Sequence, residues 1–165
     1  MKYIVGVIVV IIAAIAAVLM LSSGPVGTNT GTKPKQVVKL VDYVDKSGSE
    51  VSLTTQGRVV GESEFRSVRV TISKNSRKVE ILKGYDMTVE KSEQFANSKT
   101  GYDVLLRSLA NAGFSKTKTS SYSDERGVCP LGNRYVYLLR DNGNEISRSW
   151  SANCSNEGTF AGTSS

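Results

Sequence analysis

A run of 19 residues without a charge, Tyr3–Leu21, constrains this chain more than any other feature of its sequence. As a helix, the run would be about 28 Å long, close to the hydrocarbon core of a bilayer at about 30 Å. A helix also satisfies its own backbone hydrogen bonds, as a lipid environment requires. We therefore predict a transmembrane signal-anchor helix over residues 1–21.

The charges around this run predict its orientation. Lys2 and the terminal amine precede it, so the positive-inside rule places the N-terminus in the cytoplasm and the C-terminal domain outside it. The alternative is a signal peptide that is cleaved, which leaves a secreted protein. The apolar part of a signal peptide is usually about 7–15 residues long, and Leu21 fits poorly at the −3 position of a cut after Ser23. These features favour a single-pass membrane protein with an uncleaved anchor. The short anchor also favours a bacterial source.

Three further segments follow the predicted anchor. Residues 22–35 are mainly Gly, Ser, Thr, Pro and Lys, the composition of a flexible linker. Residues 36–155 are long enough for one domain with one hydrophobic core. Residues 156–165 are mostly small and polar, and we predict a disordered tail.

The predicted domain is of the α+β class: an antiparallel β-sheet of about five to seven strands with one main α-helix packed on one face. Apolar and polar residues alternate over 68–73 and 79–81, and Lys74–Arg77 would form the turn of this hairpin. An apolar stripe with helical spacing predicts a helix over 101–112, with Thr100 as N-cap and Gly113 in the left-handed conformation. Less regular segments are predicted as β-rich (37–44), as a strand (51–60), as a short helical turn (92–97) and as an exposed, mobile loop (116–127).

A second hairpin is predicted over 133–150, because Asp141-Asn142-Gly143-Asn144 is a strong turn sequence. A symmetric turn would place Tyr135 opposite Trp150 and Tyr137 opposite Arg148. Tyr, Trp and Arg are enriched at the energetic centres of protein interfaces, and aromatic rings also stack on sugars. The hairpin therefore offers a candidate binding surface, although its rings would equally serve as core beneath the helix. That surface consists of Tyr135, Tyr137, Arg148 and Trp150.

Cys129 and Cys154, the two cysteines of the chain, flank this hairpin. Cys154 would fall opposite position 131, two residues from Cys129, and a bend at 129–132 would absorb that offset. We predict a disulfide that closes the base of the hairpin. The spacing does not match the C-x-x-C pattern of redox-active pairs.

The composition excludes several classes of function. The chain has no histidine, which removes Ser-His-Asp and Cys-His catalysis and histidine-ligated zinc. The net charge of +6 comes from dispersed residues, which does not indicate a nucleic-acid partner. No motif identifies a catalytic residue, a cofactor site or a metal site.

These observations predict a membrane-anchored, extracytoplasmic, non-catalytic binding or structural module of the cell envelope. Its expected contacts are the membrane, through the N-terminal helix, and either another envelope protein or a surface glycan. Two alternatives stay open. One is a protein inhibitor that inserts the loop 116–127 or the segment 129–132, and the other is a small envelope enzyme that works without histidine.

Overall fold

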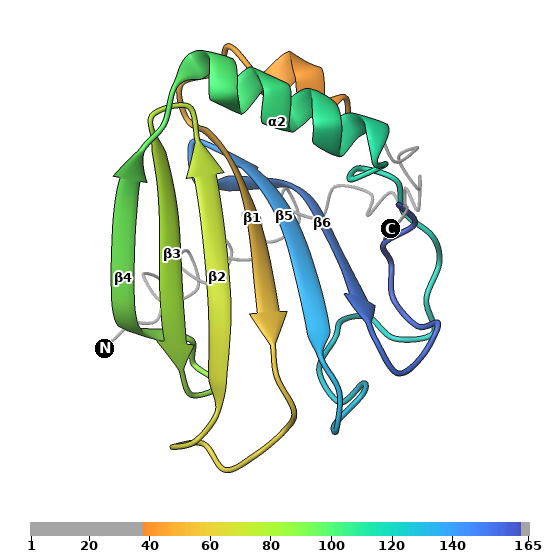
Figure 1. Ribbon diagram of the computed structural model, residues 1–165. Helices are drawn as coiled ribbons and strands as arrows, with labels where there is room; N and C mark the ends of the chain where they lie inside the picture. The colour runs from red at the N-terminus through yellow and green to blue at the C-terminus, as the bar shows by residue number, and fades with distance from the viewer. Residues whose placement is uncertain (1–37, 163–165) are drawn as a thin grey trace, which may run out of the picture. The chain divides into compact units, whose positions relative to one another are not determined.

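The computed structural model describes residues 38–162 of the chain (Figure 1). The predicted anchor, 1–21, and the predicted linker, 22–35, lie outside this range. Within residues 38–162, no helix combines the length and the apolar character that a membrane crossing needs.

Six antiparallel strands form one sheet in the order β4-β3-β2-β1-β5-β6. The first four follow one another as a meander, and the helix α2 then carries the chain back across the sheet to β5, beside β1 (Figure 1). The predicted antiparallel sheet with one main helix is thereby confirmed. The elements are η1 (Leu40–Tyr43), β1 (Ser49–Gln56), β2 (Arg66–Ser73), β3 (Ser76–Lys83), β4 (Thr88–Ala96), α2 (Lys99–Asn111), β5 (Arg134–Asp141) and β6 (Asn144–Ala152).

Both ends of α2 are set by local sequence. The Ser98 hydroxyl accepts a hydrogen bond from the Gly101 N–H at 3.0 Å and caps the first turn. At the other end, Gly113 has φ +78°, and the Phe114 N–H donates to the Leu109 carbonyl at 2.9 Å. The prediction for Gly113 is confirmed. That for Thr100 is wrong, because the helix begins at Lys99 and encloses Thr100 in its first turn.

Two segments differ from their predicted structure. Residues 92–97, predicted as a helical turn, belong mostly to β4, where alternate residues form backbone hydrogen bonds with β3. The stretch predicted as β-rich, 37–44, contains the 3₁₀ helix η1. Leu40 and Val44 are buried here while Asp42 between them is exposed, which fits a helical turn, because an extended chain would place all three on one face.

The main core lies where α2 crosses the sheet, near the start of β1 and the end of β5 (Figure 1). Val51 and Leu139 face Leu106 there, and all three are almost completely buried. Beside them, the hydroxyls of Ser49 and Tyr102 lie 2.6 Å apart. Burial raises the pKa of Tyr102 above its ordinary value, against a smaller opposite effect of this hydrogen bond. The helix is thus fixed over one end of the sheet.

The β5–β6 hairpin has the predicted turn but not the predicted register. Asp141 pairs with Asn144 as expected, and a bulge between Leu139 and Arg140 then shifts the register by one residue. Val136, and not Tyr135, lies opposite Trp150. A shift of one residue moves side chains to the other face of a sheet. The predicted pairs are therefore corrected to Tyr135 with Ser151, Tyr137 with Ser149 and Leu138 with Arg148.

The segment between α2 and β5 packs on the opposite face of this hairpin. Val128 and Cys129 lie there against Val136 and Trp150 and form a second apolar cluster. The predicted disulfide between Cys129 and Cys154 is present and closes the base of the hairpin. Glu125, within the loop predicted to be exposed, is buried, although most of its neighbours are exposed.

Candidate functional site

The face of the sheet that carries α2 is only partly covered. Alternation along the strands places Leu53 on the same face as Val51, two residues away, but α2 covers only Val51. Leu53 remains 37% exposed, against 3% for Val51. The uncovered apolar surface continues over Val68 on β2 and over Val79 and Ile81 on β3, which are 44%, 38% and 37% exposed.

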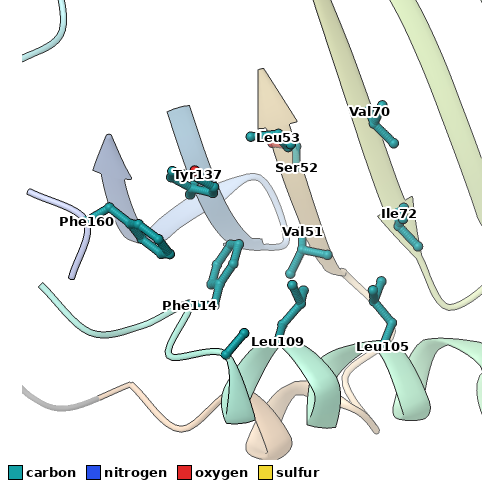
Figure 2. Close-up of a pocket in the computed structure, with 11 residues that line it drawn as sticks. Val51, Ser52, Leu53, Val70, Ile72, Leu105, Leu109, Phe114, Tyr137 and Phe160 are labelled. Carbon is teal, nitrogen blue, oxygen red and sulfur yellow. The ribbon is translucent and has the colours of Figure 1, made fainter. Parts of the chain in front are cut away.

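An apolar groove follows the boundary between α2 and this uncovered surface (Figure 2). Leu53 and Val70 form its floor on the sheet, and Leu105 and Leu109 of α2 point toward them from the other side. The volume is about 420 Å³, within the range of small-molecule sites. The helical period that buries Tyr102 and Leu106 also produces this wall, because Leu105 and Leu109 lie at the edge of the same stripe.

Three aromatic rings close one end of the groove. The Tyr137 and Phe160 rings stack with centroids 4.2 Å apart, and the Phe114 ring meets Tyr137 edge-on at 6.1 Å (Figure 2). Phe114 follows the helix, Tyr137 belongs to β5, and Phe160 comes from the C-terminal segment. Pairs of this geometry are favourable beyond the area they bury. The rings thus form an end wall built from three distant parts of the chain.

The C-terminal segment that supplies Phe160 is held by backbone hydrogen bonds. The Phe160 N–H donates to the Trp150 carbonyl at 3.0 Å, and the Ala161 N–H donates to the Lys116 carbonyl at 3.1 Å. This segment belongs to the predicted tail, 156–165, of which the structure describes residues up to 162. The one signal in the sequence was Phe160 itself, a large apolar residue within a polar tail.

The electrostatic character of the groove is simple. None of the described residues that line it carries a charge, and its polar contributions come from Ser52 and Tyr137. The Tyr137 hydroxyl lies 3.4 Å from the Ser151 hydroxyl, which gives it a polar neighbour. Such a site removes an apolar ligand from water without offering a charge to orient it.

The structure separates the residues of the predicted binding surface. Tyr137 lines the groove, and Tyr135 lies half-buried on the same face of the sheet. Arg148 and Trp150 belong to the opposite face, where Trp150 is completely buried. These four side chains therefore do not form one surface. Their role in binding stays a prediction, and of the four only Tyr137 lies in the groove.

The opposite face of the sheet carries paired charges. The buried Glu125 carboxylate accepts hydrogen bonds from Arg148 at 2.5 Å and from Gln56 at 3.2 Å. Glu80 is 4% exposed and pairs with Arg69 at 2.8 Å. Burial raises the pKa of Glu80, but the hydrogen bonds from Arg69 and Lys78 outweigh it and lower that pKa below its ordinary value. These carboxylates are held as ion pairs within the fold.

Within residues 38–162, no group of three or more Cys, Asp or Glu side chains is placed to hold a metal ion. Comparisons of the chain with protein-family models, with curated proteins and with solved structures found no match.

Proposed function

We propose that this protein is a non-catalytic binding module on the extracytoplasmic side of a membrane and that its apolar groove holds the acyl chain of a membrane lipid. The observation that carries the proposal is the groove itself. Aliphatic side chains line it on both sides, and no described residue in its lining is charged.

The lining favours an aliphatic chain over an extended peptide. A peptide brings an N–H and a C=O at almost every residue, and each costs free energy when it is buried without a partner. The floor of the groove is the face of the sheet, whose backbone groups pair with neighbouring strands, so Leu53 and Val70 offer only side chains. An acyl chain has no such groups to satisfy, and the volume of about 420 Å³ lies within the range of sites that hold small ligands.

The predicted anchor makes membrane lipid the nearest source of such a chain. A flexible linker of the length predicted at 22–35 has a root-mean-square length of about 20 Å, which would keep the domain close to the bilayer surface. Transfer of one methylene group from water to an apolar site lowers the free energy by about 0.8 kcal/mol. A lipid chain in the bilayer is already out of water, so it does not gain this free energy again when it enters the groove. Exchange between bilayer and groove is therefore nearly balanced, as reversible holding requires.

The test uses the full-length protein in lipid nanodiscs that contain a phospholipid with a diazirine at the end of one acyl chain. Illumination followed by peptide mass spectrometry locates the labelled residues. We expect label on the lining of the groove: at Leu53 on its floor, at Leu109 on its helical wall, or at Phe114 in its end wall. Labelling confined to residues 1–37 would contradict the proposal.

Two matched variants make this test specific to the groove. Leu53→Glu places a charge on the floor, and we expect it to abolish the label on Leu109 and Phe114. Val104→Glu makes the same chemical change at a residue of α2 that is 58% exposed and does not line the groove, and it should leave the label unchanged. Equal labelling of both variants would show that the label does not report an occupied groove.

A second candidate function is inhibition of, or docking to, a partner protein through the turn at 129–132. Leu131 is 88% exposed at the tip of this turn. The turn is held by the Gly132 N–H, which donates to the Cys129 carbonyl at 3.0 Å, and by the disulfide. A pull-down from detergent-solubilised membranes should then capture a partner with the native chain and lose it with Leu131→Asp. Capture of the same proteins by both chains would exclude this candidate.

A further inference from the structure

The two edges of the sheet differ in how their backbone is covered. Beside β6, the C-terminal segment forms a bridge from Gly158 to Ser151, and the Phe160 N–H donates to the Trp150 carbonyl. The opposite edge of the sheet is β4 (Figure 1). All nine of its residues are exposed. In the described part of the chain, nothing pairs with the outer side of β4. A long strand edge of this kind is a template for another strand.

The hydrogen bonding of β4 shows which backbone groups face outward. The Asn97 N–H donates to the Asn75 carbonyl at 3.0 Å, in register with the β3–β4 ladder. Backbone groups in an antiparallel ladder alternate between the two sides of a strand. Residues 93 and 95 therefore bond toward β3, and the N–H and C=O groups of Ser92 and Gln94 point away from the sheet.

Charges of opposite sign flank Ser92 along this edge. Lys91 lies opposite Ile81 and Glu93 lies opposite Val79, so both side chains are on the face of the sheet that carries α2. Both are exposed, and neither belongs to an ion pair within the described residues. The neighbouring Glu90, in contrast, is bound by Arg66 at 2.6 Å.

We propose that a second copy of this chain pairs with β4 in antiparallel fashion, about a two-fold axis at Ser92. Ser92 then lies opposite its own copy, and the outward N–H and C=O groups of the two serines bond to each other. Lys91 of each chain lies opposite Glu93 of the other. This is a non-hydrogen-bonded pair, in which side chains approach most closely, and opposite charges there stabilise the pairing.

The same residues exclude most other registers. An exposed lysine usually protects a strand edge against pairing, because its charge is left without a partner. Lys91 lies directly opposite a carboxylate, that of Glu93, only when the two-fold axis passes through Ser92. A bulge at Glu90, between the pairs Ile81–Lys91 and Leu82–Val89, interrupts the ladder two residues before Ser92, so regular pairing about the axis is confined to residues 91–93. The resulting dimer is closed, because each chain uses its free β4 edge once.

Cysteine cross-linking of the full-length protein in detergent tests this arrangement. In the proposed pairing the two Ser92 Cα atoms are about 5.5 Å apart, whereas the two Ala96 Cα atoms are about 27 Å apart. With a short bismaleimide, we expect roughly tenfold more cross-linked dimer for Ser92→Cys than for Ala96→Cys. Equal yields, or no dimer for Ser92→Cys, would overturn the proposal.

Charge reversal tests the register. In the Ser92→Cys background, Lys91→Glu places two carboxylates opposite each other, and Glu93→Lys places two ammonium groups there. Each change should abolish the cross-linked dimer, because like charges directly opposite destabilise a strand pair. The double variant Lys91→Glu, Glu93→Lys exchanges the two signs and should restore the yield. A double variant that stays monomeric would overturn the pairing of Lys91 with Glu93.

Discussion

At the scale of single residues, the face of the sheet opposite α2 shows how buried charge is accommodated. Glu80 lies opposite Arg69 in the β2–β3 ladder, and its carboxylate also contacts the Lys78 ammonium at 3.1 Å. The pairing is strong enough to lower the pKa of Glu80 despite burial, which by itself raises it. A carboxylate whose pKa falls on folding stabilises the folded state whenever it is ionised.

This pKa shift predicts a dependence of stability on pH. The contribution of Glu80 is present above its unfolded pKa, about 4.5, and is lost as the pH falls through the lower pKa of the folded state. Glu80→Gln should lower the free energy of unfolding at pH 7 by about 1–2 kcal/mol and weaken its decline toward pH 3. Urea unfolding between pH 3 and pH 7 measures both effects.

Glu64→Gln provides the control for this experiment. It removes the same charge, but from an exposed residue without an ion pair among the described residues and outside the proposed β4 interface. Its pH profile should therefore follow that of the native chain. An unchanged profile for Glu80→Gln would show that the ion pairs of Glu80 do not contribute to acid stability.

At the scale of elements, α2 shows how a helix acquires defined ends. Ser98 satisfies one of the backbone N–H groups that the first turn leaves without a partner, and Gly113 ends the helix with a left-handed residue. The same helix supplies the wall of the groove through Leu105 and Leu109. The cap at Ser98 thus stabilises the element on which the proposed site depends.

The position of the cap predicts a difference between two conservative substitutions. Ser98→Ala removes the hydrogen bond to the Gly101 N–H and should lower the free energy of unfolding by about 1 kcal/mol. Thr100→Ala changes a residue inside the first turn and should have little effect. Thermal and urea unfolding measure the free energy of unfolding of both variants. An equal decrease in the two variants would contradict the cap at Ser98.

At the scale of the whole molecule, the C-terminal half is joined by contacts between distant parts of the chain. The disulfide links residues 25 positions apart, and the apolar cluster around Trp150 lies beside it. The C-terminal segment then crosses to the other side of the hairpin, where Phe160 stacks on Tyr137. The disulfide and the end wall of the groove are thus connected through the C-terminal segment that follows Cys154.

Removal of the disulfide should therefore affect global stability. Cys129→Ala with Cys154→Ala enlarges the set of unfolded conformations, and in the chain-entropy model this costs about 3 kcal/mol. Urea unfolding of the full-length variant, monitored by the fluorescence of Trp150, measures the loss. An unchanged urea midpoint would contradict this prediction, because it would show that the disulfide does not stabilise the folded chain.

The sequence alone determined the features that depend on neighbouring residues. The strands of the β2–β3 hairpin follow from a period of 2 residues, and the stripe of α2 follows from a period of 3.6. The turn follows from Asn142 and Gly143, which accept positive φ. The disulfide was predictable because two cysteines flank one recognisable turn. These patterns are local, so each could be read without knowledge of the remaining fold.

The tertiary structure decided what depends on distant partners. A bulge beside Leu139 places Tyr137 and Trp150 on opposite faces, and the Phe160 ring stacks on Tyr137, a residue 23 positions earlier in the chain. The apolar groove exists because one helix covers one end of a six-stranded sheet and leaves Leu53 open. Burial is set by the elements that pack across a surface, and residues far apart in the sequence supply those elements.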